Sequence, residues 1–396
     1  MLFKTKNIAS IILVLVLLVA FSCSKNKKVS IKTSPVIQDT FGLSYAYFDK
    51  GFSDSIISSC QAQTKDLQKY FDRLHKSGGF NGNILIARKG VPIFSKSYGY
   101  RRFSTKDSLR IDDPFQLASV SKTITSTAVL QLYNQGLIKL TDTIQQYIPE
   151  FPKKYQGITI DDLLCHHSGL FEYWHFNDKE WRKGSHFLTF KKLMDKIIEI
   201  EPSVNFYPNR RFKYNNLNYV LLAHIVEKVS GQSFEDYLQE NIFKKANMTT
   251  AFVFDANDST TIQKRLAYGH YSGRKEYILD YPDGIYGDKG IYASVIDMLN
   301  FDQALYHEAL ISKETMELAF ANKPIKNRRT RRKYGYGWRI DEDELGNRVV
   351  YHNGWWKGYK TKFARVGDNE WTVVVLSNRL RANRFTYKNI LKLLYK

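Results

Sequence analysis

Ser119 and Lys122 are the residues whose types and spacing first suggest chemistry. They are three positions apart in segment 114–136, whose apolar pattern predicts a helix with both side chains on one face. A serine hydroxyl is a weak nucleophile at neutral pH. A lysine amine one helical turn away can remove its proton if burial or a neighbouring cation lowers the lysine pKa. Ser119 is therefore a candidate nucleophile, and Lys122 is its candidate base.

The S-x-x-K spacing alone does not identify a nucleophile. It recurs in the chain at Ser22/Lys25, Ser24/Lys27 and Ser272/Lys275. The structural alternative for Ser119 is a serine that caps a helix next to a lysine in solvent. Ser119 differs from the other copies in its setting, because it begins a helical pattern with apolar residues to bury.

Two further polar motifs lie beside predicted regular elements. Tyr214-Asn215-Asn216 precedes an amphipathic stretch at 219–229, and His352-Asn353-Gly354 follows an apolar strand at 349–351. Each motif alone is explained equally well by side-chain packing or by a turn. Their order along the chain is the informative feature.

Taken in order, the three motifs resemble those of the serine β-lactamase and penicillin-binding protein superfamily, which run S-x-x-K, Y-x-N, then K-T-G or H-x-G. The branch that they resemble contains class C β-lactamases, D-alanyl-D-alanine carboxypeptidases and related esterases. The flanking sequence is similar over about residues 80–378. It includes FQLASVSKTIT at 115–125, LTD at 140–142, ITIDDLLCHHSGL at 158–170, YGYGW at 334–338 and VVVLSN at 373–378.

This resemblance implies a role for each motif residue. Ser119 would form an acyl-enzyme, Lys122 would accept its proton, and Tyr214 would share the proton transfer to the leaving group. Asn216 would bind a substrate amide. The backbone N–H groups of Ser119 and Trp355 would bind the oxyanion. Trp355 is the residue after Gly354, the glycine that ends the third motif.

Two departures from the family pattern bear on the substrate. His352 stands where most β-lactamases have lysine, and a histidine with an ordinary pKa of about 6.5 would pair weakly with a substrate carboxylate at pH 7. Trp355 and Trp356 are bulky for a strand edge that must admit a peptide. We therefore expect a serine hydrolase of an ester, amide or D-amino-acid peptide in the bacterial cell envelope. The alternatives are a weak β-lactamase and a non-catalytic binding protein of the same fold.

The first 45 residues indicate export and anchoring. Residues 1–22 combine a short basic start with an apolar run at 11–21, which is too short to span a membrane and is typical of a signal peptide. The AFSC sequence at 20–23 resembles a bacterial lipoprotein signal, with Cys23 as the lipidated residue, although an ordinary signal peptide remains the alternative. Residues 23–45 would be a tether. This predicts an envelope lipoprotein of the outer membrane, facing the periplasm or the cell surface.

Residues 46–396 are expected to form one α+β domain with a mainly antiparallel sheet flanked by helices. The pattern predicts a helix at 53–76, strands at 83–88 and 91–98, and late strands at 336–340, 348–352, 360–366 and 371–377 before a helix at 385–395. Early and late strands must then pair across an all-helical subdomain at 140–267, with clear helices at 191–199 and 218–229. The α/β body would comprise 46–139 and 268–396.

Metal and nucleotide chemistry have little support in the sequence. Cys165-His166-His167 lacks the spaced ligands of a zinc site, and phosphate-binding glycine loops are absent, so we expect no metal and no cofactor. The formal charge of +20 includes seven basic residues at 323–333. In an exported protein this favours an anionic envelope polymer over nucleic acid, with a solvated loop as the alternative. The sequence leaves the redox state of Cys60 and Cys165 open.

Overall fold

The computed structural model describes residues 37–38, 44–45, 50–173, 176, 187–255, 265–271, 274–324, 333–380 and 385–396. Residues 36–396 form one compact unit. The predicted signal peptide and Cys23 lie outside the described residues, as does most of the basic segment 323–333. Within the predicted tether, β1 (Ile37–Gln38) pairs with β2 (Ser44–Tyr45). Among the described helices, none has the length and apolar character needed to cross a membrane.

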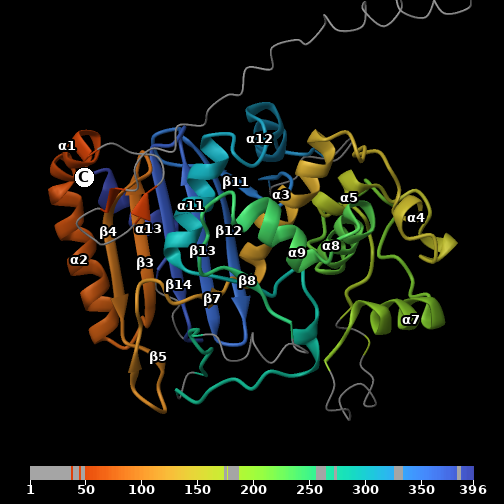
Figure 1. Ribbon diagram of the computed structural model, residues 1–396, viewed down its shortest axis with the longest axis horizontal. Coiled ribbons are helices and arrows are strands. Elements are labelled where there is room, and N and C mark those ends of the chain that lie inside the picture. Colours follow the sequence, from red (N-terminus) through yellow and green to blue (C-terminus); the bar gives the residue numbers. More distant parts are fainter. Residues whose placement is uncertain are drawn as a thin grey trace, which may run out of the picture. The chain divides into compact units, whose positions relative to one another are not determined.

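A seven-stranded antiparallel sheet forms the centre of the domain, in the order β10-β11-β12-β13-β14-β3-β4 (Figure 1). The late strand β14 pairs with the early strand β3, which confirms the predicted pairing of early and late strands. The strands are β3 (Gly82–Arg88), β4 (Val91–Tyr98), β10 (Lys333–Tyr334), β11 (Arg339–Glu342), β12 (Arg348–Trp356), β13 (Tyr359–Val366) and β14 (Trp371–Ser377).

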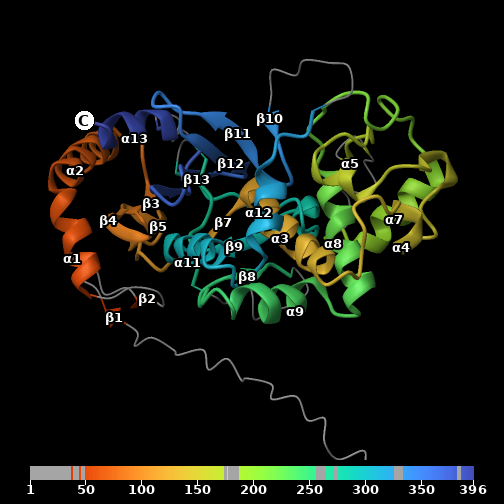
Figure 2. The same cartoon turned by 90° about the horizontal axis from the view of Figure 1, so that it is seen from above.

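Helices cover both faces of this sheet, and apolar side chains alternate between two cores because successive residues of a strand face opposite sides. One core lies under the terminal helices α1 (Lys50–Ser59), α2 (Gln61–Lys76) and α13 (Tyr387–Leu394) (Figure 2). The larger core lies on the other face and includes α11 (Val295–Tyr306). The predicted helix 53–76 is thus two helices, separated at the buried Cys60.

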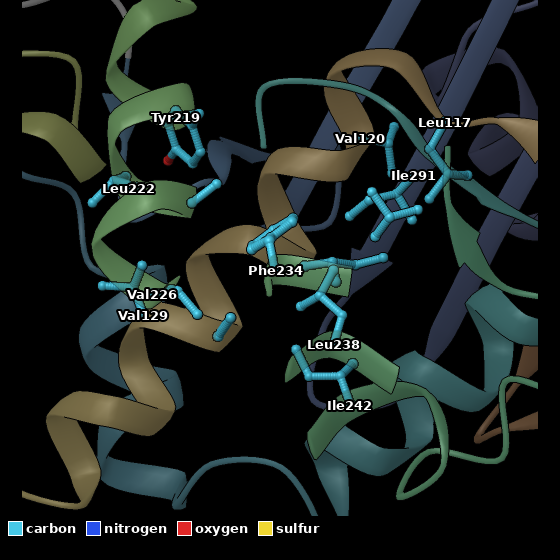
Figure 3. Packing of buried hydrophobic residues seen from close by; sticks show 14 of the residues in the cluster. Leu117, Val120, Val129, Tyr219, Leu222, Val226, Phe234, Leu238, Ile242 and Ile291 are labelled. Carbon is cyan, nitrogen blue, oxygen red and sulfur yellow. The ribbon is translucent and has the colours of Figure 1, made fainter. Parts of the chain in front are cut away.

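The segment that carries Ser119 lies in the larger core. The short helix η1 (Ala118–Val120) leads directly into α3 (Ser121–Asn134), which packs against α8 (Leu217–Ser230). Figure 3 shows Val129 of α3 close to Val226 of α8, and Leu117 and Val120 beside Ile291. Burial of nearly every side chain of α3 fixes the start of this helix, and with it the position of Ser119.

The segment predicted to be all helical contains most of the remaining helices. Their bounds are α4 (Ile144–Tyr147), η2 (Lys153–Tyr155), α5 (Ile160–Leu164), α7 (Phe190–Ile200), α9 (Phe234–Leu238) and η4 (Gln239–Phe243). The all-helical prediction is wrong at its end. There β8 (Phe252–Val253) pairs with β9 (Ile291–Ala293), which also pairs with β7 (Phe115–Gln116). This small sheet ties the helical segment to the strand that leads into Ser119.

The other short elements connect these layers. They are β5 (Tyr100–Arg102), β6 (Asp107–Ser108), η5 (Tyr281–Gly284) and α12 (Lys313–Phe320). The structure thus has the predicted fold class, a large antiparallel sheet flanked by helices.

Candidate active site

Ser119 lies on η1 immediately before α3, where its side chain is half-buried and lines a pocket of about 460 Å³. The preceding residue, Ala118, has φ of +50°, a conformation that costs a non-glycine residue free energy. The packing of α3 and the neighbouring strands holds this turn in place. Lys122 is one helical turn along, and its Nζ donates to the Ser119 Oγ at 3.2 Å. The predicted pairing of nucleophile and base is therefore present in the geometry.

The Lys122 side chain is fully buried among neutral oxygen atoms. Besides Ser119, its Nζ donates to the Asn216 Oδ1 at 2.9 Å and to the backbone carbonyl of Asp288 at 2.8 Å. Burial lowers the pKa of Lys122 from 10.5 to about 8. Asp288 and Glu172 oppose this shift, and Arg339 reinforces it. With a pKa of 8, about one tenth of the lysine is neutral at pH 7 and able to accept a proton.

Tyr214 lies over the same amine. Its ring centre is 5.0 Å from the Lys122 Nζ and 5.3 Å from the Arg339 guanidinium carbon. Among the described residues its buried hydroxyl forms no hydrogen bond of full geometry. Burial raises the pKa of Tyr214, while Ser119 and Arg339 counteract that rise. The hydroxyl therefore lies near Ser119 with no hydrogen-bond partner of its own among the described residues.

Glu172 is a site residue that the sequence did not reveal. Its carboxylate accepts the Asn216 backbone N–H at 3.1 Å and the Asn216 Nδ2–H at 3.4 Å. These bonds turn the Asn216 Oδ1 toward Lys122, so Glu172 positions the amide that contacts the base. Burial raises the pKa of Glu172, against the lowering by Asn216 and Lys122. A lone glutamate after the SGL sequence carries no motif signal that could have identified it.

His352 belongs to a buried chain of hydrogen bonds. The Asn215 backbone N–H donates to the His166 Nδ1 at 3.1 Å, so the His166 Nε2 carries a proton and donates to the Tyr334 hydroxyl at 3.2 Å. Tyr334 in turn donates to the His352 Nε2 at 3.1 Å. The His352 Nδ1–H completes the chain at the Asn353 carbonyl, at 2.8 Å. Every member of this chain is satisfied with both imidazoles neutral.

His352 was expected to bind substrate, with only weak pairing to a carboxylate, and this geometry does not support that contact. The side chain is only 1% exposed and does not line the pocket. Burial, together with Arg339 and Lys122, lowers the pKa of His352 well below 6.5, which keeps the ring uncharged near neutral pH. The pKa of His166 is also lowered well below 6.5, and burial is the largest cause of that shift. The structure therefore places His352 behind the pocket wall, inside β12 and not in a turn after it.

Gly354 and Trp355 form the wall opposite Ser119. A Cβ atom on Gly354 would lie 2.3 Å from the Leu117 carbonyl oxygen and 3.0 Å from the Ala118 Cβ, so only glycine lets β12 approach η1 this closely. This close approach brings the backbone of Trp355 to the same pocket as that of Ser119. These are the two segments whose N–H groups were predicted to bind the oxyanion.

Two cations in the pocket were also missed. Arg339, on β11, lines the pocket beside Tyr214, and no ion pair of this side chain is found among the described residues. Lys289 lines it too; its Nζ donates to the Tyr173 hydroxyl at 2.8 Å, and burial lowers its pKa. Arg339 follows the YGYGW sequence directly, but a single arginine on a short strand gives no sequence signal of its own. Asp288 lines the pocket as well and pairs with Lys289 at 3.4 Å, so Arg339 is the cation of the two that could meet an anionic group.

The cysteines and histidines proposed as alternatives have structural roles. Cys60 and Cys165 are both buried and free. Across the described part of the chain, no cluster of three or more histidine, cysteine or acidic side chains could hold a metal ion. His166, the middle residue of the Cys165-His166-His167 sequence, is used in the chain to Tyr334.

Known proteins are similar to this chain in sequence and in fold. The family model described as Beta-lactamase matches residues 67–395. Penicillin-binding protein 4* of Bacillus subtilis (strain 168) is 35% identical over 332 residues, covering 81% of this chain and 72% of that protein. In fold, the chain is similar to a D-stereospecific amidohydrolase from Streptomyces sp. (TM-score 0.62, 19% identity, 88% and 99% of the two chains covered). It is also similar to a β-lactamase/D-alanine carboxypeptidase from Pseudomonas syringae (TM-score 0.66, 16% identity, 87% and 98% covered).

Proposed function

Because the chain belongs to the β-lactamase family of serine hydrolases, we propose that it hydrolyses an ester, amide or D-amino-acid peptide of the bacterial cell envelope through an acyl-enzyme on Ser119. The observation that carries this proposal is the 3.2 Å contact between the Ser119 Oγ and a fully buried Lys122 amine. Burial lowers the pKa of that amine so that it can act as a base near neutral pH. The contact places it within reach of the proton on the Ser119 Oγ.

The proposed reaction has two halves. Neutral Lys122 accepts the Ser119 proton as the Oγ bonds to the substrate carbonyl carbon, and the oxyanion forms between the backbone segments of Ser119 and Trp355. The bond to the leaving group then breaks, and the leaving group takes a proton relayed through Lys122 and Tyr214. In the second half, a water molecule gives a proton to the same pair and attacks the carbonyl carbon of the acyl-enzyme ester. The bond to the Ser119 Oγ breaks, the acid leaves, and the pair returns the proton to the Oγ.

Arg339 supports a substrate with an anionic group near the scissile bond. Its guanidinium faces the pocket beside Tyr214 and can form a bidentate contact with a carboxylate. This assigns to Arg339 the carboxylate contact that was predicted for His352. Two proteins of similar fold, a D-stereospecific amidohydrolase and a β-lactamase/D-alanine carboxypeptidase, are consistent with a D-amino-acid substrate. Rapid hydrolysis of β-lactams is not the activity we propose.

Covalent labelling tests the proposal. The full chain should be marked by a fluorophosphonate and by a labelled penicillin, and Ser119→Ala should remove both labels. The native protein should also hydrolyse p-nitrophenyl esters of short acids, and it should hydrolyse nitrocefin slowly. Absence of any difference between the native protein and Ser119→Ala would leave the non-catalytic binding protein as the better reading. Rapid nitrocefin turnover would instead favour a β-lactamase.

We extend the proposal to location. The sequence at 20–23 supports a lipid anchor on Cys23 in the cell envelope. The seven basic residues at 323–333 support an anionic envelope polymer as partner. Mass spectrometry of the N-terminal peptide of the purified protein should find a diacylglyceryl group on Cys23, and Cys23→Ser should release the protein from membranes.

A further inference from the structure

A second pocket, of about 310 Å³, adjoins the one that contains Ser119. Gly354 and Trp355 line both pockets, and the Trp355 side chain is 60% exposed between them. The rest of the second pocket is formed by β13 and by the residues that lead into α13, chiefly Lys360, Lys362, Phe385 and Thr386. Of the residues given a role in catalysis above, only Trp355 also lines it, on the wall that the two pockets share.

Two lysines, Lys360 and Lys362, give this second pocket a positive charge. Lys360 and Lys362 alternate with Thr361 along β13, and the Thr361 hydroxyl donates to the Leu117 carbonyl on the Ser119 side of the sheet. The lysines therefore share the opposite face, where they pair across the ladder with Trp355 and Asn353. This places two cations two residues apart on one face, beside the edge of the catalytic pocket.

The charged side chains of this pocket are both cationic. Among the described residues that line it there are two lysines and no acidic residue. The Lys362 Nζ contacts the neutral Asn353 Oδ1 at 3.3 Å and lies 5.5 Å from the centre of the Phe385 ring. Burial lowers the pKa of both lysines, and Lys360 lowers that of Lys362 further. An anion bound between them would remove this mutual repulsion.

We propose that the Lys360–Lys362 pocket binds a carboxylate or phosphate group on a distal part of the substrate whose scissile bond lies at Ser119. The shared wall of Gly354 and Trp355 makes the two pockets continuous, and Asn353 links them as well, since it lines the first and contacts Lys362 in the second. The inference rests on the proposed hydrolase function and deepens it. The substrate then carries at least two separated polar ends, one at Arg339 and one at the lysine pair.

A footprinting experiment tests anion binding independently of turnover. The full-length Ser119→Ala protein is treated with an acetylating reagent at constant ionic strength, with sodium chloride replaced by inorganic phosphate or by acetate. Peptide mass spectrometry should show acetylation at Lys360 and Lys362 slowed at least threefold and saturably. Lys191 and Lys192, which are exposed on α7, should be unaffected. Protection by phosphate alone or by acetate alone identifies the group preferred. Equal rates in all three salts would overturn the proposal.

A kinetic arm tests whether the anion belongs to the substrate itself. Mono-p-nitrophenyl esters of dicarboxylic acids of increasing length, and of the matching ω-phosphorylated acids, are compared with p-nitrophenyl esters of the corresponding methyl-ended acids. In the native protein the ratio of kcat/KM values, anionic over methyl-ended, should peak at one chain length. Lys360→Gln/Lys362→Gln should lower that peak about tenfold, whereas Lys191→Gln/Lys192→Gln should not. A ratio that does not change in the double variant, despite footprint protection, would show that the anion is not part of the substrate. Hydrolysis of the methyl-ended esters by native protein reports on the proposed function separately.

Discussion

Two of the cations buried in the described part of the protein, Lys122 and Arg365, have opposite surroundings. Arg365 is 1% exposed, and its Nε donates to Asp302 at 2.5 Å; the Thr372 hydroxyl donates to the other Asp302 oxygen at 2.7 Å. Lys122 is just as buried, but its three hydrogen-bond acceptors are all neutral. A partnered arginine keeps its proton permanently. A lysine among neutral oxygens can release its proton, which is what a general base requires.

The largest expected effect comes from removing the catalytic cation. Lys122→Met should lower kcat for a p-nitrophenyl ester by about 10²–10⁴-fold, the usual contribution of a general base. It should also stabilise the protein at pH 7 by about 1–3 kcal/mol, because the native state must hold an amine whose pKa is lowered to about 8.

The sign of this stability effect depends on pH. Below about pH 8 the unfolded amine binds a proton more strongly than the folded one, so the native protein bears the full penalty. The penalty fades as the pH rises from about 8 toward 10.5. Urea unfolding of native protein and Lys122→Met at pH 7 and pH 10 checks this. A variant that is less stable than the native protein at pH 7 would contradict the comparison.

Removal of the ion-paired Arg365 should have the opposite effect on the free energy of unfolding. Arg365→Met leaves Asp302 buried without its partner and should destabilise the fold by about 3–5 kcal/mol, with kcat/KM per folded molecule unchanged. Arg348→Met is the matched control, because Arg348 and its partner Glu317 are each 44% exposed, and it should cost about 0–1 kcal/mol. Chemical denaturation and active-site titration separate the two quantities. Equal costs for the two arginines would show that burial is not what distinguishes them.

The chain of neutral hydrogen bonds behind the pocket should have an intermediate effect. Tyr334→Phe leaves ring nitrogens of His166 and His352 without partners and should cost about 1–3 kcal/mol in the free energy of unfolding. Tyr207→Phe, at a residue that is 76% exposed, should cost nothing measurable.

The same chain sets an expectation for the native pH profile. The kcat/KM should show no inflection from His352 between pH 5.5 and 8, because the pKa of this ring lies well below 6.5. An inflection near pH 6.5 that disappears in His352→Gln would mean that the ring is accessible after all.

The smallest effect is expected for Glu172, which influences the pKa of Lys122 and holds Asn216 without contacting the substrate. Glu172→Gln should lower the limiting kcat/KM by about threefold to tenfold, since Asn216 loses a charged hydrogen-bond partner. The negative charge of Glu172 raises the pKa of Lys122, so its removal should shift the rise of kcat/KM with pH from about 8 to lower pH. Glu150→Gln, at an exposed position, is the control. If the limiting kcat/KM falls but the apparent pKa does not shift, the role of Glu172 is purely structural.

The sequence predicted most of the regular elements, because periodicity reports burial. The strands predicted from the apolar runs of β3, β4, β13 and β14, and the helices predicted from the spacing in α7, α8 and α13, matched the structure to within a few residues. The break at Cys60 and the two-residue strand β8 were missed, because such short features depend on tertiary packing and leave no periodic pattern.

The candidate site divides in the same way. Ser119, Lys122, Tyr214 and Asn216 lie in recognisable motifs, and the structure brings them together. Arg339 and Glu172 are single residues in otherwise ordinary segments, so only the folded geometry shows that they face the pocket or its amide. For His352 the motif identified the right position, but the burial that removes its charge depends on Tyr334 and on nearby cations that are remote in sequence.

The length of β12 has a consequence for what the enzyme can accept. Among the described strands, β11 pairs with β12 only at 348–351, whereas β13 pairs with it through Trp356, so the last five residues of β12 have a free edge at the pocket. Such an edge recognises an incoming chain through main-chain amides, which every peptide has. Under the proposed function, this edge would accept peptides with varied side chains, and the charged ends of a substrate would discriminate among them.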